Sequence, residues 1–180
     1  MTDADQFEAF VRRYQDMVFA TAVRLLGSRV EAEDVAQTVF LRAFQRFDQI
    51  GASPAAAGWL KTVTRNACLN HLSRYRTRWR LFSELGRAGD HDSRTTDEVV
   101  FVATDSPAVD VELADRRNHL TRALHRLPDH QRVPLVLFHF EDMSYQQIAA
   151  ALGVSVGKVK TDMHRGREAL RGLLSDHAPR

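Results

Sequence analysis

Residues 143–170 read MSYQQIAAALGVSVGKVKTDMHRGREAL, two short amphipathic segments that meet at a glycine. Ser144 is placed to cap the first segment and Ser155 to cap the second. Gly153 supplies the permissive backbone that a tight turn requires. The apolar side chains expected to hold the two segments together are Ile148, Ala149, Leu152, Val154, Val159, Met163 and Leu170. This spacing predicts a helix-turn-helix.

The second segment of this motif, 156–174, has a polar outward face that predicts contact with DNA. Basic and hydroxyl side chains at these positions reach base edges and phosphates in a major groove. The candidate contacts are Ser155, Gly157, Lys158, Lys160, Thr161, His164, Arg165 and Arg167. An acidic residue at Asp162 disfavours phosphate and can accept a hydrogen bond from cytosine. An ordinary helical hairpin with a charged face is the alternative.

Helical periodicity also dominates the chain on the N-terminal side of this motif. Helices are expected over 6–26, 31–47, about 59–79, 110–127 and 133–140, with a loop at 48–58. Residues expected to face inward are Val35, Val39, Phe40, Ala43, Phe44 and Phe47, then Leu60, Val63, Thr64, Ala67 and His71. The stretch 85–109 is rich in Gly, Asp, Ser and Thr and has no sustained period. The sequence therefore predicts an all-α protein.

The expected organisation is two small helical domains, 1–82 and 110–180, joined by a flexible acidic linker over 83–109. Charge supports this division. Six basic residues and no acidic ones lie in 59–82, acidic residues dominate 83–114, and the chain from 155 onward is basic again. Two basic patches separated by an acidic segment suggest two contacts with a polyanion.

Composition excludes several other classes of protein. The single cysteine, Cys68, rules out an internal disulfide and a cysteine-based zinc site, and we expect it to be a buried structural thiol. His125, His130 and His139 lack the spacing of a metal pair, and no phosphate loop or nucleophile motif occurs. We therefore expect no enzymatic activity, no metal and no cofactor.

No apolar run approaches the ~20 residues that span a bilayer, so no membrane insertion is expected. The acidic N-terminus lacks the apolar region of a signal peptide. These features predict a cytoplasmic protein.

Three stretches carry a family resemblance. EAEDVAQTVFLRAFQRF (31–47) and GWLKTVTRNACLNHLSRYR (58–76) resemble region 2 of the sigma-70 family of RNA polymerase sigma factors. The stretch from Leu127 to Leu170 resembles region 4 of the same family. The length of the chain points to the two-domain, extracytoplasmic-function (ECF) subfamily. This resemblance implies a bacterial transcription initiation factor that binds core polymerase, recognises −35 and −10 promoter elements and stabilises the melted −10 strand.

The resemblance also implies roles for particular residues. Residues implied to dock on a coiled coil of the largest polymerase subunit are Asp34, Gln37, Thr38, Leu41 and Arg42. Residues implied to bind the −10 strand are Lys61, Thr62, Arg65, Asn66, Asn70, Arg74 and Arg76, while Trp59 is expected to anchor the core. The outward face of the helix-turn-helix is implied to read the −35 duplex. Further implied partners are the flap region of polymerase and an anti-sigma factor. The resemblance also implies that the carboxylate pair Glu141 and Asp142 lies at the surface, just before the helix-turn-helix.

This sequence departs from the family pattern at three places. Asn70 stands where an acidic residue is common, Asp162 stands where many members have a basic one, and the loop 49–57 lacks aromatic residues. The promoter sequence is therefore left open.

Two other functions remain open at this point. One is a stand-alone helix-turn-helix regulator with an N-terminal dimerisation or sensor domain. The other is a helical scaffold that binds no nucleic acid. Co-purification with polymerase subunits would separate a sigma factor from the first, and retention on a polyanion column would exclude the second.

Overall fold

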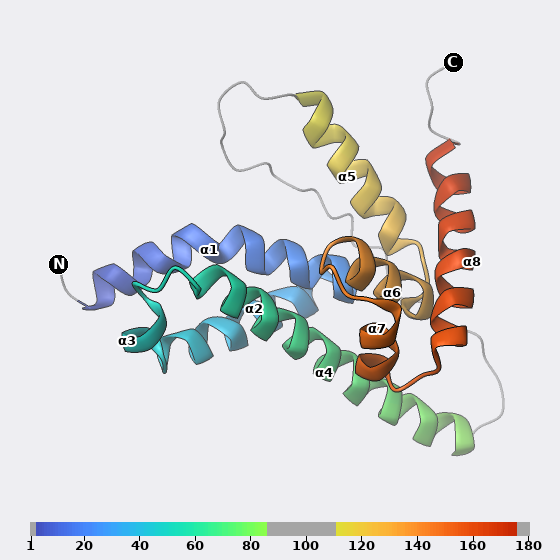
Figure 1. Ribbon diagram of the computed structural model, residues 1–180, viewed down its shortest axis with the longest axis horizontal. Coiled ribbons are helices and arrows are strands. Elements are labelled where there is room, and N and C mark those ends of the chain that lie inside the picture. The colour runs from blue at the N-terminus through green and yellow to red at the C-terminus, as the bar shows by residue number, and fades with distance from the viewer. Residues whose placement is uncertain (1–2, 86–110, 176–180) are drawn as a thin grey trace. The chain divides into compact units, whose positions relative to one another are not determined.

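The computed structural model describes residues 3–85 and 111–175, and the side chains among them except those of 74–85 and 111–114. Every regular element in these two ranges is a helix, which confirms the all-α prediction. The helices fall into two compact units on either side of the gap, and each is described by itself (Figure 1). None of the helices in the described ranges has both the length and the apolar composition that a bilayer span demands.

The first unit consists of α1 (Asp3–Leu26), α2 (Arg29–Phe44), α3 (Phe47–Ile50) and α4 (Ala56–Leu85). Gly27 ends α1 with a left-handed φ of 68°. Ser28 follows as the N-cap of α2, where its side chain accepts a hydrogen bond from the backbone N–H of Glu31 at 3.4 Å. The two long helices therefore reverse direction within a very short connection.

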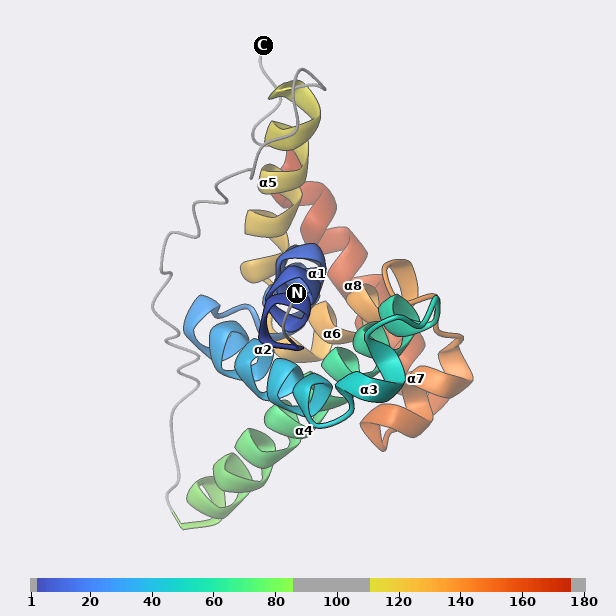
Figure 2. The same cartoon turned by 90° about the vertical axis from the view of Figure 1, so that its left-hand side faces the viewer.

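Helices α1, α2 and α4 pack against one another in pairs and lie side by side in both views (Figures 1 and 2). The largest fully buried side chains of this core are Val18, Val23, Leu25, Leu26, Val39 and Leu60. Cys68 on α4 is also fully buried, as expected for a structural thiol. Burial of these faces gives the first unit a core of its own.

Four details of the first unit differ from the sequence-based expectations. Helix α2 ends at Phe44, so Phe47 belongs to the separate turn α3, which occupies part of the expected loop. The expected inward-facing Phe44 is 60% exposed, although the edge of its ring meets Phe7 at a centroid distance of 5.0 Å. Helix α4 begins at Ala56 and continues past Phe82 to Leu85.

The second unit consists of α5 (Val111–His125), α6 (Asp129–His139), α7 (Tyr145–Leu152) and α8 (Val156–Ser175). Pro128 occupies the N-cap position of α6, where its missing N–H costs nothing. Val133, Leu137, Ile148, Val159 and Met163 are among the fully buried side chains. Helix α8 packs against α5, α6 and α7, so it closes the core of this unit.

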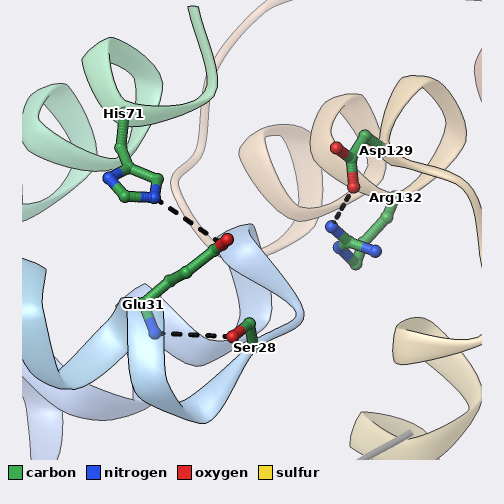
Figure 3. Close-up of polar contacts among 5 residues, drawn as sticks. All are labelled: Ser28, Glu31, His71, Asp129 and Arg132. Carbon is green, nitrogen blue, oxygen red and sulfur yellow. Dashed lines mark hydrogen bonds and ion pairs between the residues drawn. The ribbon is translucent and has the colours of Figure 1, made fainter. Parts of the chain in front are cut away.

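The buried Arg132 on α6 is a feature that the sequence did not reveal. It is 2% exposed, and its Nη1 donates a hydrogen bond to the Leu127 carbonyl at 2.9 Å. Its Nη2 pairs with Asp129 (Figure 3). The guanidinium thereby links the end of the α5–α6 connection to the first turn of α6.

Burial also corrects one expectation in this unit. Glu141, expected at the surface, is buried, whereas the neighbouring Asp142 is exposed with a left-handed φ of 53°. The sharp turn after α6 places the two adjacent carboxylates in different environments. Most of the expected linker lies outside the described residues.

Candidate nucleic-acid and polymerase interfaces

The helix-turn-helix is built by α7, α8 and the turn between them. Ser144 and Gln147 form a capping box at the start of α7: Ser144 Oγ accepts from the Gln147 N–H at 3.2 Å, and Gln147 Oε1 accepts from the Ser144 N–H at 2.8 Å. Gly153 ends α7 with a φ of 64°. Ser155 Oγ then accepts from the Lys158 N–H at 3.1 Å and caps α8. The predicted motif is confirmed.

The outward face of α8 presents nearly all of the predicted −35 contacts to solvent. The exposed residues are Ser155, Gly157, Lys158, Lys160, Thr161, His164 and Arg165. Arg167 is different, because it is half-buried and its guanidinium lies over the Phe138 ring, 5.8 Å from the centroid. The structure therefore brings seven of the eight candidates onto the exposed surface and turns the eighth toward α6.

Asp162 does not lie where the sequence suggested. Its side chain is only 8% exposed, on the inner stripe of α8 with Val159, Met163 and Gly166. Its carboxylate is paired with the Lys158 ammonium at 2.8 Å. The structure therefore contradicts the interpretation in which Asp162 accepts a hydrogen bond directly from cytosine.

An aromatic group lies where α6, α7 and α8 meet. The rings of Phe138 and Tyr145 stack with centroids 5.1 Å apart, and Phe138 also meets His139 edge-on at 4.9 Å. Partial burial lowers the pKa of His139, and the positive charge of Arg167 lowers it further. His139 is therefore neutral at pH 7, and the group presents one cation, Arg167, against aromatic faces.

On α4, the five predicted −10 contacts whose side chains are described lie toward one side of the helix. Thr62, Asn66 and Asn70 are exposed, and Lys61 and Arg65 are half-buried. Trp59, expected to anchor the core, is half-buried at the start of the same helix. Arg74 and Arg76 lie on α4, but their side chains are outside the description.

On α2, all five predicted polymerase contacts are exposed: Asp34, Gln37, Thr38, Leu41 and Arg42. Leu41 is 65% exposed, which is unusual for a leucine on a helix that packs on two others. Val30 and Phe44 are also exposed on α2, although neither was among the predicted polymerase contacts. Val30, Asp34, Gln37, Leu41 and Phe44 recur at alternating four- and three-residue spacing, so they share one face.

A polar contact behind this face connects α2 to α4. Glu31 Oε2 lies 3.7 Å from His71 Nε2, and both side chains are mostly buried (Figure 3). The backbone N–H of Glu31 is the group that Ser28 caps. The start of α2 is thereby fixed against the helix that carries the predicted −10 contacts.

Within 3–85 and 111–175, no group of three or more His, Cys, Asp or Glu side chains is arranged to hold a metal ion. The surfaces described above consist of side chains carried by helices.

Two family models match this chain. Residues 10–78 match the model described as sigma-70 region 2, and residues 117–170 match the model described as sigma-70 region 4. The ECF RNA polymerase sigma factor SigW of Bacillus subtilis is 32% identical over 97% of this chain and 91% of its own length. The RNA polymerase sigma-E factor of Streptomyces coelicolor is 34% identical over 97% of this chain and 89% of its own.

A solved structure agrees in fold. The sigma factor RpoE of Bartonella quintana, crystallised with the anti-sigma factor NepR, aligns with a TM-score of 0.52 at 22% identity and covers 96% of this chain and 98% of its own.

The chain therefore belongs to the sigma-70 family, as an ECF RNA polymerase sigma factor. It is a transcription initiation factor of the kind that directs RNA polymerase to promoters.

Proposed function

We propose that this protein binds core RNA polymerase through the exposed face of α2 and directs it to promoters with −35 and −10 elements. The observation that carries the proposal is one chain with two distinct exposed faces, the α2 face and the helix-turn-helix, each within a matched sigma-70 region. It acts by binding and performs no covalent chemistry itself.

The α2 face supports a helix-to-helix interface with the coiled coil of the largest polymerase subunit. Leu41 and Phe44 offer apolar area, and Asp34 and Gln37 offer polar groups beside it. An apolar centre with a polar rim is typical of protein interfaces. The flap region of polymerase is the proposed second contact, made by the second unit.

The two DNA contacts have separate tasks in this proposal. The polar side of α4 holds the melted −10 strand, since amide and cationic groups contact exposed bases and backbone. The residues proposed for this task are Lys61, Thr62, Arg65, Asn66, Asn70, Arg74 and Arg76. The outward face of α8 enters the −35 major groove. The proposed domains are 1–82 for polymerase and −10 binding and 110–180 for −35 binding, with 83–109 as the linker.

The remaining partner is an anti-sigma factor. This proposal is supported by the complex of the fold relative from Bartonella quintana with NepR. We propose that the protein works in the cytoplasm, where polymerase and promoter DNA are found.

Charge reversal on α2 tests the polymerase interface. Asp34→Arg combined with Gln37→Ala is expected to weaken association with core polymerase by about tenfold or more. A reversed charge or an unpaired polar group at an interface costs at least ~1.4 kcal/mol of binding free energy. The matched control is Asp16→Arg on α1, an exposed acidic residue of the same unit that lies outside the proposed face. Affinity is measured by titration of labelled protein with core enzyme, and transcription by run-off synthesis. Equal affinity for both variants would contradict the assignment of α2.

A second pair of substitutions tests the −10 assignment. Arg65→Ala with Asn66→Ala is expected to slow promoter opening by about tenfold, because a hydrogen bond that involves a charged group contributes about 1.5–3 kcal/mol. Binding to the −35 duplex is expected to stay nearly unchanged. Opening is followed by permanganate reactivity of unpaired thymines. Normal strand opening by the double variant would remove α4 from the melting role.

A further inference from the structure

An ion pair in the first turns of α8 connects the inside of the helix-turn-helix to its outward face. Lys158 Nζ lies 2.8 Å from Asp162 Oδ2, one helical turn further along. The Lys158 side chain is 52% exposed, whereas that of Asp162 is almost completely buried. The lysine is thus a surface residue whose charged end is held by an interior carboxylate.

Burial makes this pair different from an ordinary surface salt bridge. A carboxylate withdrawn from water needs a hydrogen-bonded, oppositely charged partner, and Lys158 supplies one. The backbone N–H of Lys158 is also bound to Ser155 Oγ, so its main chain is fixed by the helix cap. Lysine is usually a flexible point charge, but here its ammonium has a defined place.

Lys160 provides a natural comparison two residues further on. It is exposed on the same helix, and no ion pair or hydrogen bond of its side chain occurs in the described part of the chain. A lysine of this kind neutralises a phosphate and releases a counter-ion. Lys158 and Asp162 together carry no net charge, so the pair lacks this non-specific attraction.

We propose that Asp162 is a positioning residue that determines specificity: it holds the Lys158 ammonium so that this lysine donates to a base edge in the −35 groove and does not serve as a phosphate counter-ion. An ammonium paired once keeps two N–H donors, and guanine O6 and N7 accept from lysine. The inference rests on the proposed −35 function of α8. It predicts that Asp162 lowers affinity for random DNA and preserves preference for one base pair.

The test uses holoenzyme assembled from core polymerase and full-length variants. Its probe is a pool of promoter duplexes randomised in the −35 region, bound at several salt concentrations. Asp162→Asn is expected to steepen the slope of log affinity against log salt by about one unit, because one more cation becomes available to phosphate. Sequencing of the bound pool is expected to show a flattened preference at one base pair.

Four further variants separate positioning from a general charge effect. In a Lys158→Gln background, Asp162→Asn is expected to change neither slope nor preference, because the residue that it positions is gone. Lys158→Gln alone is expected to leave the salt slope unchanged and to flatten the base preference that Asp162→Asn also flattens. The matched Lys160→Gln is expected to lower the salt slope by about one unit. Lys158→Arg retains the charge and is expected to retain the slope.

The outcomes distinguish this inference from the function on which it rests. If Asp162→Asn steepens the slope equally in the Lys158→Gln background, Asp162 acts only as a negative charge and the inference is wrong. If Asp162→Asn fails to fold, Lys158→Gln is compared with Lys160→Gln, since a glutamine amide at position 158 can still donate a hydrogen bond to the Asp162 carboxylate. An equal loss of slope in both variants would overturn the inference. If wild-type holoenzyme selects no −35 sequence, the proposed function is itself wrong and the inference falls with it.

Discussion

At the scale of single residues, Arg132 shows how a charge stabilises an apolar unit. It lies on a helix whose neighbouring Val133, Leu135 and Val136 are also buried. Burial of a guanidinium is tolerated because its donors are used, one on the Leu127 carbonyl and one on Asp129. Removal of the side chain leaves both acceptors without this donor.

Arg132→Leu is accordingly expected to destabilise the second unit by about 1–3 kcal/mol, the cost of leaving buried polar groups unsatisfied. Both tryptophans of the chain, Trp59 and Trp79, belong to the first unit. Denaturant unfolding is therefore followed by far-UV circular dichroism for the whole chain and by tryptophan fluorescence for the first unit. The control Arg126→Leu removes an exposed arginine nearby and is expected to have little effect. Equal effects of the two variants would mean that the buried contacts of Arg132 contribute nothing.

At the scale of elements, the packing of α8 against α6 decides which face of α8 looks outward. Gly166 lies where the two helices approach closely: a Cβ at this position would come within 2.7 Å of Leu135 Cδ1 and 3.3 Å of the Gln131 carbonyl oxygen. Leu135 is itself buried, so it has little room to move. This close approach places Val159, Asp162 and Met163 on the inner side of α8.

Gly166→Ala is expected to destabilise the second unit by about 1–3 kcal/mol, because an added methyl group overpacks the α6–α8 contact. Gly172 lies on the same helix, and a Cβ added at this position would have no other atom within 4 Å. Gly172→Ala is therefore expected to stabilise the helix by about 0.5–1 kcal/mol, through helix propensity alone. Opposite signs in denaturant unfolding support this packing, and stabilisation by both substitutions would contradict it.

At the scale of the whole molecule, two units with separate cores suit the proposed contact with two promoter elements. From the composition of 83–109, we propose that this segment is a linker that proteases cut in the free protein. Limited proteolysis is expected to leave two helical fragments, assigned by mass spectrometry to the first and second units. Protection of the whole segment in the free chain, with no stable fragments, would contradict the two-domain proposal.

The sequence by itself determined the features that depend on local chemistry. Helical periodicity, the Ser144 and Ser155 caps and the permissive Gly153 all follow from interactions within a few residues of the chain, and the structure confirms them. The family was also accessible, since the motifs of regions 2 and 4 stand in the linear sequence.

Only the tertiary structure decided which way particular side chains point. Successive residues of a helix are separated by about 100°, so residues at the margin of an apolar stripe are assigned to either side by packing with other helices. Asp162 is drawn inward because Gly166 brings α8 close to α6. Phe44 is left exposed because it lies on the outward face of α2 with Leu41, whereas Val35, Val39 and Ala43 form the buried stripe. The i, i+4 spacing allows Lys158 and Asp162 to pair within α8 itself, but the burial of the Asp162 carboxylate depends on how α8 packs against α6.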